Sequence, residues 1–495
     1  MTLGALLPLG VLLSSLVPGL LIFLLAESRH RTRTALNLAA AIVKLGLIAV
    51  IARGVLRGEP FETRLPFVPG ADLLLRADSF SLLFVTLSAV LWLVTTVYAV
   101  GYLEGSPHRS RFFGFFSLCV SATMGVALAG NLVTFFVFYE LLTLATYPLV
   151  VHRGTPEALR AGDRYLRYTI GGGVVLLAGI ASLYALVGSF DFTEGGAIGG
   201  AGDHRALLVL VFALLIGGLG VKAALVPLHA WLPAAMVAPA PVSALLHAVA
   251  VVKAGAFGIT RVVYDVYGVR LADELEVTRG LAIVAAVTIV YGSFRALGQT
   301  DLKRRLAYST VSQVSFIVLG VAVVGRLTTI GGVVHLVHQG LMKITLFFCA
   351  GNLASALGIH AVKELRGVGR RMPLTMAAFT LASLGMMGVP PLAGFVTKWY
   401  LGAGAIDAGE PWVLVILAAS TLLNAAYLLP IVYDAWFREP EAPWPPRTGR
   451  AEVDPWLLLP TLAAAAMAIA AGLFAGTSLS PLAWAERIAD REVRP

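Results

Sequence analysis

The sequence predicts an all-α integral membrane protein with about fourteen transmembrane helices. Its 495 residues are 58% hydrophobic and only 13% charged, which is more apolar surface than a soluble chain of this length can bury. Long apolar runs recur along the whole chain, and basic residues gather in every second connection between them. The net charge of +9 therefore follows membrane topology and does not indicate a nucleic-acid partner.

Apolar runs of about 20 residues can cross the hydrocarbon core of a bilayer as a helix. We expect fourteen such spans, at residues 3–26, 35–52, 78–101, 112–129, 132–151, 168–188, 206–225, 240–260, 280–297, 306–324, 328–353, 374–401, 411–435 and 455–475. The first lacks a basic leading segment and a small-residue cleavage pattern, so we expect a retained span rather than a signal peptide.

The loop charges predict the orientation. The connections after spans 1, 3, 5, 9, 11 and 13 hold about twice as many lysines and arginines as those after spans 2, 6, 8, 10 and 12. Because short basic loops stay in the cytoplasm, we expect the first set inside and both termini outside. Residues 59–77 alternate in polarity around a Pro-Gly pair, which predicts a small β-hairpin over the outer ends of the first spans.

Prolines interrupt the helical pattern twice at membrane depth, at residues 227–241 and at Pro390-Pro391. A proline inside a helix costs about 3 kcal/mol, and the freed backbone groups are tolerated there only where protein or water satisfies them. Paired breaks in the two halves of a chain are typical of transporters built from inverted repeats. Kinks that only shape the packing are the alternative.

Lysine and arginine are distributed differently. The chain has thirty arginines and seven lysines, and by these spans no arginine lies at mid-membrane. Five lysines do, namely Lys44, Lys222, Lys253, Lys343 and Lys398. A guanidinium stays charged at any relevant pH, whereas a desolvated lysine can release its proton. The pattern favours a path that carries protons, although Lys44 lies in an otherwise ordinary span and fits a structural role equally well.

Glu140 is the only carboxylate that we expect near the middle of a span. A buried carboxylate needs a partner or a proton. A lysine such as Lys222 would keep Glu140 ionised, and the two would form the only buried pair of opposite charge that the sequence offers. A protonated, structural Glu140 is the alternative.

Three histidines extend this polar row: His247 in the eighth span, and His335 and His338 in the eleventh. His335, Gln339 and Lys343 repeat at helical spacing and predict a polar stripe that a proton relay can use. His247 and Lys253 are six residues apart, about 240° around a straight helix, so water would have to join them. No carboxylate accompanies the histidines at metal-ligand spacing, and we expect no metal site.

Cofactor motifs are absent from the sequence. Cys119 and Cys349 each lie in an apolar span, where we expect them to be small buried residues. No CxxC pair, nucleotide-binding glycine loop or iron–sulfur spacing is present. We therefore expect no bound cofactor and no catalytic residues in the enzymatic sense.

Five motifs together resemble a known family. They are FFVFYELLTLATYPLV around Glu140, the segment from GVK at Lys222 to VVKAG at Lys253, DLKRRLAYSTVSQ at 301–313, HLVHQGLMK at 335–343, and GVPPLAGFVTKWY around Lys398. The chain looks like the antiporter-like membrane subunits shared by Mrp-type cation/proton antiporters, respiratory complex I and group 4 membrane hydrogenases. The resemblance runs from about residue 75 to 435, and the D-type subunit of Mrp antiporters is the most similar.

This resemblance implies two inverted five-helix repeats, each with one broken helix. We then expect three N-terminal spans with the hairpin at 1–110, repeats at 111–265 and 277–435, and a last span with its tail at 436–495. It also implies a proton route through Glu140, Lys222, Lys253 and Lys398. The protein is then expected in the cell membrane as a multi-pass subunit with partner membrane subunits, and sodium or another cation is the second transported ion. One departure is Gln339, where relatives often carry histidine.

Other functions remain open at this point. A proton-pumping subunit of a complex I-like oxidoreductase or hydrogenase would share the same motifs, although Lys398 stands where one such subunit carries glutamate, and no long lateral helix is expected after the last span. A membrane-bound transferase would need acids or histidines clustered in large loops. A purely structural scaffold would have no use for five buried lysines.

Overall fold

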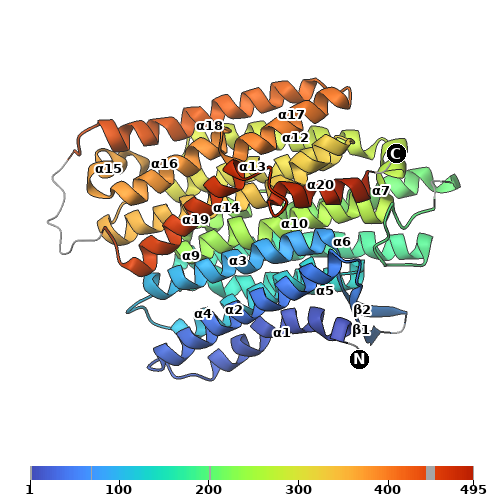
Figure 1. The fold of residues 1–495 in the computed structure, drawn as a ribbon, viewed down its shortest axis with the longest axis horizontal. Helices are drawn as coiled ribbons and strands as arrows, with labels where there is room; N and C mark the ends of the chain where they lie inside the picture. The colour runs from blue at the N-terminus through green and yellow to red at the C-terminus, as the bar shows by residue number, and fades with distance from the viewer. Residues whose placement is uncertain (1–2, 69, 200–201, 442–451, 494–495) are drawn as a thin grey trace.

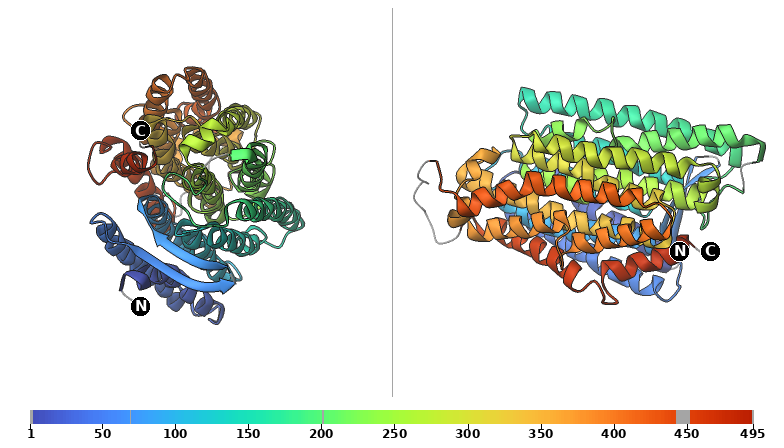
Figure 2. Two further views of the ribbon diagram at one scale, coloured as in Figure 1. Left: turned by 90° about the vertical axis from the view of Figure 1, so that its right-hand side faces the viewer. Right: turned by 90° about the horizontal axis from the view of Figure 1, so that it is seen from above.

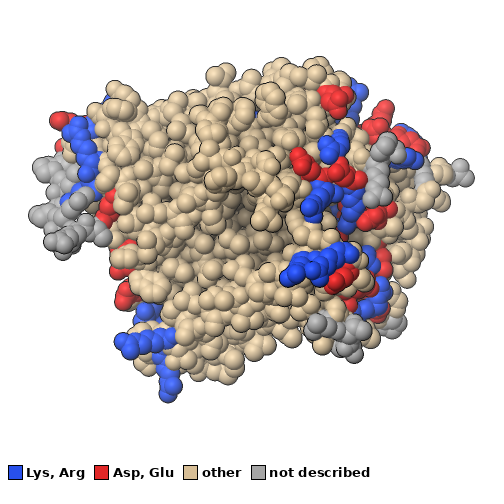
Figure 3. Space-filling view, in the orientation of Figure 1, with Lys and Arg blue, Asp and Glu red and all other residues tan. Residues whose placement is uncertain are grey.

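The computed structural model describes residues 3–68, 70–199, 202–441 and 452–493. The long helices lie side by side along one axis, with their connections at the two ends (Figure 1). One end carries both termini and a small β-hairpin, and we call it the hairpin end. On the face shown in Figure 3, charged side chains gather at the two ends and leave a broad uncharged band between them. This arrangement is that of a multi-pass membrane protein.

The first half of the chain contains the hairpin and one broken helix. Its elements are α1 (Leu3–Phe23), α2 (His30–Val55), β1 (Phe61–Val68), β2 (Ala71–Ala77), α3 (Ser79–Tyr102), α4 (Arg109–Ala127), α5 (Leu132–Val150), α6 (Pro156–Val187), η1 (Gly202–His204), α7 (Arg205–Lys222), α8 (Trp231–Ala234), η2 (Ala235–Val237), α9 (Ala240–Ala244), η3 (Leu245–Val249), α10 (Val251–Arg261), η4 (Val262–Tyr267) and α11 (Val269–Glu274).

The second half contains the other broken helix and the C-terminal helices. Its elements are α12 (Val277–Leu297), α13 (Leu302–Ala322), α14 (Arg326–Leu357), η5 (Val362–Leu365), α15 (Val368–Arg371), α16 (Pro373–Met387), α17 (Ala393–Asp407), α18 (Trp412–Phe437), α19 (Pro455–Leu473) and α20 (Pro481–Glu492).

The predicted all-α membrane fold is confirmed. Among the described residues, thirteen helices are long and apolar enough to cross a membrane, counting 240–267 as one. The remaining predicted span, 374–401, is divided into α16 and α17 because the chain leaves the helix at Gly388. Helix α6 begins at Pro156 rather than 168, since the Thr155 side chain caps it by accepting a hydrogen bond from Ala158 N.

The predicted hairpin is also confirmed, apart from Pro69, which lies outside the described residues. Strand β1 pairs antiparallel with β2, with Phe61 opposite Ala77. Thr134 Oγ1 at the start of α5 accepts a hydrogen bond from Leu74 N at 2.7 Å, which fixes β2 against the bundle. In the end-on view the two strands lie across the ends of the N-terminal helices (Figure 2).

The first helix break follows Lys222. Ala224 has a φ of +57°, in the left-handed region, and the Val226–Pro227 peptide is cis. Two side chains satisfy backbone groups that the break frees: Trp231 Nε1 donates to Val221 O at 2.7 Å, and Thr288 Oγ1 accepts from Val226 N at 3.1 Å. The chain thus leaves the helix inside the membrane without exposing unpaired backbone to lipid.

The second break lies between α16 and α17, at Gly388–Leu392. Asn424 Nδ2 of α18 donates to Met386 O at 3.2 Å and satisfies a carbonyl at the end of α16. Helix α16 begins at the end opposite the hairpin, whereas α7 begins at the hairpin end (Figure 1). The two broken helices therefore run in opposite directions, as inverted repeats require, while the residue boundaries expected for the repeats stay a prediction.

Two helices form the centre of the bundle. The apolar windows of the run 240–267 and of α14 are completely buried by other parts of the chain. The first of these is not a regular α-helix, because π-helical turns η3 and η4 flank α10. Such turns are rare and often mark functional sites.

Helix α20 was not predicted from the sequence. It packs against α3 and α14 at the hairpin end, and Trp484 Nε1 donates to Ser79 O at 2.6 Å. Its twelve residues alternate polar and apolar side chains at helical spacing, so a search for long apolar runs cannot find it. Next to the turn between α19 and α20 the surface is hollowed (Figure 3), where a groove of about 590 Å³ separates α20 from α2.

Close packing at glycine gives a testable prediction for the fold. A Cβ on Gly255 of α10 would lie 2.2 Å from Ala223 N, in the backbone of the first break, whereas a Cβ on Gly280 of α12 would meet nothing within 4 Å. We expect Gly255→Ala to destabilise the protein by about 1–3 kcal/mol through overpacking. Gly280→Ala should be neutral or stabilise it by about 0.5–1 kcal/mol.

Thermal unfolding of the two purified variants in the same detergent measures this difference. Equal melting temperatures would show that α10 does not pack closely against the backbone of the first break.

Candidate functional site

Glu140 and Lys222 meet at the first break. Lys222 Nζ lies 3.9 Å from Glu140 Oε1, with the lysine side chain fully buried and the glutamate 25% exposed. The same amine donates to the carbonyl of Tyr139 and sits 3.3 Å from the centre of the Tyr139 ring. The predicted pairing is therefore present, and a backbone carbonyl and an aromatic face add to the stabilisation of the ammonium.

Helix α6 leaves room for the glutamate. A Cβ on Gly173 would lie 2.7 Å from Glu140 Oε1, so any larger residue there would displace the carboxylate. Gly171, two residues earlier on the same helix, has nothing within 4 Å of such a Cβ. Gly173 is thus a residue of the site that sequence reasoning missed, because only the packed structure shows which of the consecutive glycines faces Glu140.

Lys253 lies on the helix that packs against the first break. Its side chain is fully buried, and its Nζ donates to Leu336 O of α14 at 2.7 Å. Gly255 on the same helix abuts the backbone of Lys222 and Ala223. Lys253 therefore bridges the first half of the chain, through the break, to the central helix of the second half.

His247 lies in the π-helical turn η3 before α10. Its ring stacks on Phe347 with a centroid distance of 4.5 Å, and neither ring nitrogen has a hydrogen-bond partner among the described residues. The 240° separation from Lys253, derived for a straight α-helix, does not apply because the π turn and the kink at Ala250 intervene. The two side chains share no direct hydrogen bond in the structure.

His335 and His338 converge on one hydroxyl. Thr397 Oγ1 of α17 lies 3.2 Å from His335 Nδ1 and 2.9 Å from His338 Nδ1. Thr397 is fully buried and precedes Lys398 directly. His335, Gln339 and Lys343 lie at the predicted spacing on the continuous helix α14, and their use as a relay stays a prediction. The structure adds a cross-helix junction at Thr397, which links α14 to α17 and which one sequence cannot reveal.

Lys343 lies two turns further along α14 and faces α13. Its Nζ donates to Ser309 Oγ at 2.6 Å and to Leu306 O at 3.2 Å. Tyr427 donates to the same Ser309 hydroxyl at 2.7 Å, which extends the polar network to α18. Lys343 therefore joins α14 to α13 and, through Ser309, to α18.

The Lys398 side chain reaches back from α17 to the second break. Its Nζ donates to Met387 O at 2.6 Å and to Thr421 Oγ1 at 2.7 Å. A Cβ on Gly388, which has a φ of +88°, would lie 2.7 Å from the Lys398 Cδ atom. The break thus provides both an acceptor carbonyl and the space through which the lysine stem passes.

Lys44 is buried apart from the row. Its Nζ donates to Ser15 Oγ of α1 at 2.6 Å and lies 4.7 Å from the ring of Trp92 on α3. These contacts tie the three N-terminal helices together. They favour the structural role that the sequence left open.

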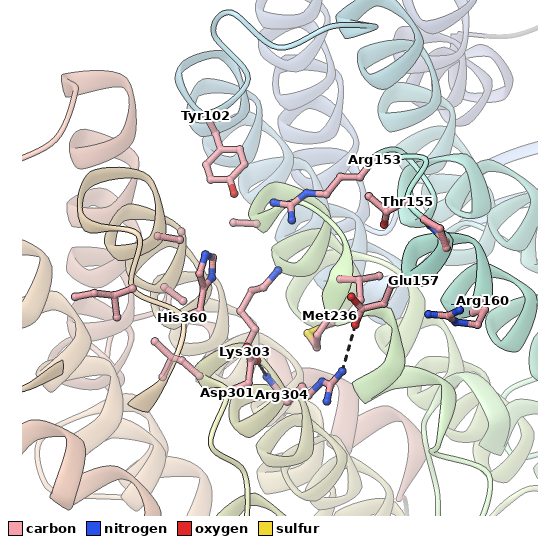
Figure 4. Close-up of a pocket in the computed structure, with 18 residues that line it drawn as sticks. Tyr102, Arg153, Thr155, Glu157, Arg160, Met236, Asp301, Lys303, Arg304 and His360 are labelled. Carbon is pink, nitrogen blue, oxygen red and sulfur yellow. Dashed lines mark hydrogen bonds and ion pairs between the residues drawn. The ribbon is translucent and has the colours of Figure 1, made fainter. Parts of the chain in front are cut away.

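A basic pocket of about 620 Å³ opens at the end opposite the hairpin, where α6 and α13 begin. Figure 4 shows the residues that line it. Lys303 extends into it from α13, and its Nζ donates to Ala238 O at 2.7 Å, just before α9. The ion pair between Arg304 and Glu157 lies at the pocket wall, at 3.6 Å. In the sequence, the DLKRR run counts as a basic connection and as part of a family motif, but it gives Lys303 itself no place in a site.

One prediction about charge pairs is wrong. Arg261, just after the predicted eighth span, is 1% exposed and lies 2.8 Å from Asp265 and 2.9 Å from Asp78. Glu140–Lys222 is therefore not the only buried pair of opposite charge. The predicted spans did not reveal the ion pairs around Arg261. The residues of this group come from the end of one helix, the cap of another and the C-terminal helix.

Comparison with known proteins identifies relatives over most of the chain. A family model described as NADH:quinone oxidoreductase/Mrp antiporter, TM, matches residues 129–424. NADH-quinone oxidoreductase subunit N of Desulforudis audaxviator (strain MP104C) is 35% identical over 456 residues, covering 88% of this chain and 89% of that protein.

Two further similar proteins are a subunit of a Na(+)/H(+) antiporter and a chain of a Mrp complex. The D subunit of the Na(+)/H(+) antiporter of Bacillus subtilis (strain 168) is 29% identical over 376 residues, and the match covers 75% of each chain. A chain in the structure of the Mrp complex from Dietzia sp. DQ12-45-1b has a TM-score of 0.86 at 25% identity, and the match covers 100% of this chain and 98% of that one.

Proposed function

The chain belongs to the NADH:quinone oxidoreductase/Mrp antiporter family of membrane proteins, and we propose that it carries protons along a row of ionisable residues through the middle of the bundle. The row is made of Glu140, Lys222, Lys253, the pair His335 and His338, and Lys398, with His247 and Lys343 beside it. As an antiporter-like subunit the protein is a transporter rather than an enzyme.

The observation that carries this proposal is that each residue of the row contacts the helix that holds the following residue of the row. Lys222 ends at the break on which α10 packs, Lys253 bonds to α14, and His335 and His338 bond to Thr397 beside Lys398. Amines and imidazoles can take up and release protons near neutral pH when buried, whereas guanidinium groups cannot. A structural scaffold would not need this choice of residues.

The orientation is part of the proposal. The basic loops lie at the end opposite the hairpin and support a cytoplasmic location for that end, with both termini outside and the protein in the cell membrane. The pocket around Lys303 would take up protons on the cytoplasmic side. Its floor lies next to Ala238 and α9, and the helix run from there leads to His247 and Lys253.

For the parent assembly we propose a Mrp-type sodium/proton antiporter with further membrane subunits. The likeness to a chain of a solved Mrp complex over its full length supports this assignment, as does the similarity to the D subunit of a sodium/proton antiporter. The second candidate is a redox-driven complex of the NADH-quinone oxidoreductase type. The higher identity to a subunit N, over 89% of that protein, favours it.

Purification of the intact complex separates these candidates. The subunits are identified by mass spectrometry, and proton flux is measured in proteoliposomes with a sodium gradient or with a reductant and quinone. Sodium-dependent flux in a complex without iron–sulfur subunits supports the antiporter. Flux that needs electron transfer assigns the chain to a redox-driven complex.

We expect Glu140→Ala and Lys222→Ala each to lower proton flux at least about tenfold, or about 1.4 kcal/mol on the limiting barrier. Each change removes one partner of a buried pair and leaves the other charge uncompensated. Gly173→Ala should act in the same direction by displacing the carboxylate, and Gly171→Ala on the same helix is its control. Flux is measured in proteoliposomes at equal protein content. Wild-type flux in both charge variants would remove this pair from the route.

Lys253 and Lys44 allow a matched comparison of two fully buried lysines. Methionine keeps the volume of the side chain and removes the amine. We expect Lys253→Met to lower flux about tenfold or more, because the row is interrupted between its halves. Lys44→Met should keep flux and change only thermal stability, since its contacts are with Ser15 and Trp92. An inactive Lys44 variant beside an active Lys253 variant would reverse the assignment.

Lys398 tests whether the row needs exchangeable protons. We expect Lys398→Arg to assemble but to lose most of the flux, because arginine keeps its charge and cannot release the proton. Lys398→Glu supplies another titratable group and should retain part of the flux. Side-by-side flux measurements decide the point, and full activity of the arginine variant would mean that position 398 supplies only a fixed positive charge.

A further inference from the structure

A second group of ionisable residues lies at the hairpin end, where α20 meets the rest of the bundle. Its members come from five segments of the chain: Asp78 before α3, Glu194 in the loop after α6, Arg261 on α10, Asp265 in η4, and Arg491 with Glu492 on α20. We call these six residues the outer cluster. None of them belongs to the row described above.

Arg261 organises the buried side of the outer cluster. Its guanidinium contacts Asp265 Oδ2 at 2.8 Å and Asp78 Oδ2 at 2.9 Å, and donates to Ser81 Oγ at 2.9 Å. The arginine and Asp265 are 1% and 2% exposed. Such a charge is kept in place by the partners around it rather than by water.

Arg491 brings the C-terminal helix into the cluster. Its guanidinium lies 3.4 Å from Asp78, 3.2 Å from Asp265 and 3.3 Å from Glu194. It also contacts Glu492 Oε1 at 2.8 Å. The cluster is thus shared between the start of α3, the end of the central helix run and α20, and it reaches solvent through Glu194, which is 61% exposed.

The charges of the outer cluster do not balance. Two guanidinium groups face four carboxylates, so with every group ionised the cluster would hold an excess of two negative charges. Glu492 carries the clearest sign of this excess. Its side chain is 1% exposed, and its Oε2 has no hydrogen-bond partner among the described residues. A buried carboxylate oxygen without a donor is costly unless it binds a proton.

The surroundings of Glu492 support a bound proton. Burial, together with the charges of Asp265 and Asp78, raises the pKa of Glu492 to about 8, although Arg491 and Arg261 act to lower it. Burial would also raise the pKa of Asp78, but Arg261 and Arg491 hold it below its ordinary range. The proton therefore belongs on Glu492 rather than on Asp78.

The outer cluster is close to the proton row. Arg261 follows Lys253 by eight residues on the same helix, about 12 Å at 1.5 Å per residue. Tyr264 of η4 shares a hydrogen bond of 2.8 Å with Thr329 of α14, and lies within electrostatic range of Glu492 and Asp265. Thr329 precedes His335 by six residues, about 9 Å along α14. Polar side chains thus lie between the row and the cluster.

We infer that the outer cluster is a proton-release site: Glu492 accepts a proton that comes from the row and passes it to water at the hairpin end. The inference rests on the proposed function. In this step a water molecule near Tyr264 that has received an extra proton from the row transfers it to Glu492, so that an O–H bond forms on the carboxylate and neutral water remains. The O–H bond on Glu492 breaks when the proton passes to water beside Glu194, which leaves the carboxylate ionised again. No electron is transferred.

The test uses the intact complex in proteoliposomes with Glu492→Gln. Glutamine keeps the shape of the side chain but cannot exchange a proton. We expect outward proton flux to fall at least about tenfold. The control is Asp490→Asn on the same helix, which removes an exposed ion pair with Arg326 and leaves the cluster intact; it should keep full flux.

Infrared difference spectroscopy provides the second measurement. Between acidic and alkaline pH the wild-type complex should lose the carbonyl signal of a protonated carboxylic acid with a midpoint near pH 8, the pKa of Glu492. Glu492→Gln should lack this signal. If the signal persists in the variant, or if the variant keeps full flux, the inference is wrong.

The pH dependence of helix docking separates a proton site from a purely structural contact. The pKa of Glu492 is raised from its ordinary value of 4.5 to about 8 when α20 is docked. Between these two pH values the docked helix keeps a proton on Glu492 that the detached helix has lost, so docking becomes less favourable as the pH rises. Protection of α20 from proteolysis should therefore fall as pH rises through this window. In Glu492→Gln the helix should stay protected without this fall.

The proposed function and this inference can fail separately. If the wild-type complex moves no protons, the proposed function is wrong, and the infrared and proteolysis measurements still decide whether Glu492 binds the proton. If Lys222→Ala stops flux and Glu492→Gln does not, the row stands and protons leave by another route.

Discussion

The constraint on which this structure depends is that the middle of a membrane offers no water to pair with a freed backbone group or a charge. A polar group at that depth is costly unless the protein supplies a partner, and the freed backbone groups of both breaks have such partners. The first break is possible because Trp231 and Thr288 complete its backbone hydrogen bonds, and the second because Asn424 does so. Once the breaks exist, they provide the sites in which Lys222 and Lys398 can be held.

The two kinds of cation meet this constraint in different ways. The buried arginine of the outer cluster is surrounded by carboxylates, which match its permanent charge. The lysines of the row are held mainly by backbone carbonyls, with a carboxylate only at Lys222. A carbonyl accepts a hydrogen bond from a neutral amine as well as from an ammonium. Fixed charge and exchangeable charge are thus distinguished by their partners as well as by residue type.

Much of this arrangement could be predicted from the sequence, because apolar runs and buried lysines are local signals. The spans and both breaks follow from residue types and spacing. The Glu140–Lys222 pair was expected as one way to compensate a buried carboxylate, and the structure contains it. The junction at Thr397 could not be predicted, since a single threonine among apolar residues looks like any other. The outer cluster and α20 were missed because their order comes from packing between distant segments, and the π turns change a spacing that holds only for a regular helix.

The carbonyl contacts of the lysines have one more consequence. Lys222 is bonded to α5, Lys253 to α14, and Lys398 to the end of α16 and to α18, so each amine is also a tie between helices. A charged amine makes a stronger tie than a neutral one. In the proposed route, a proton bound to one of these amines would strengthen the contact between two helices, and its release would weaken that contact. A neighbouring protein bound to these helices would therefore experience a change in their mechanical compliance when the charge of a buried amine changes, although it exchanges no proton itself.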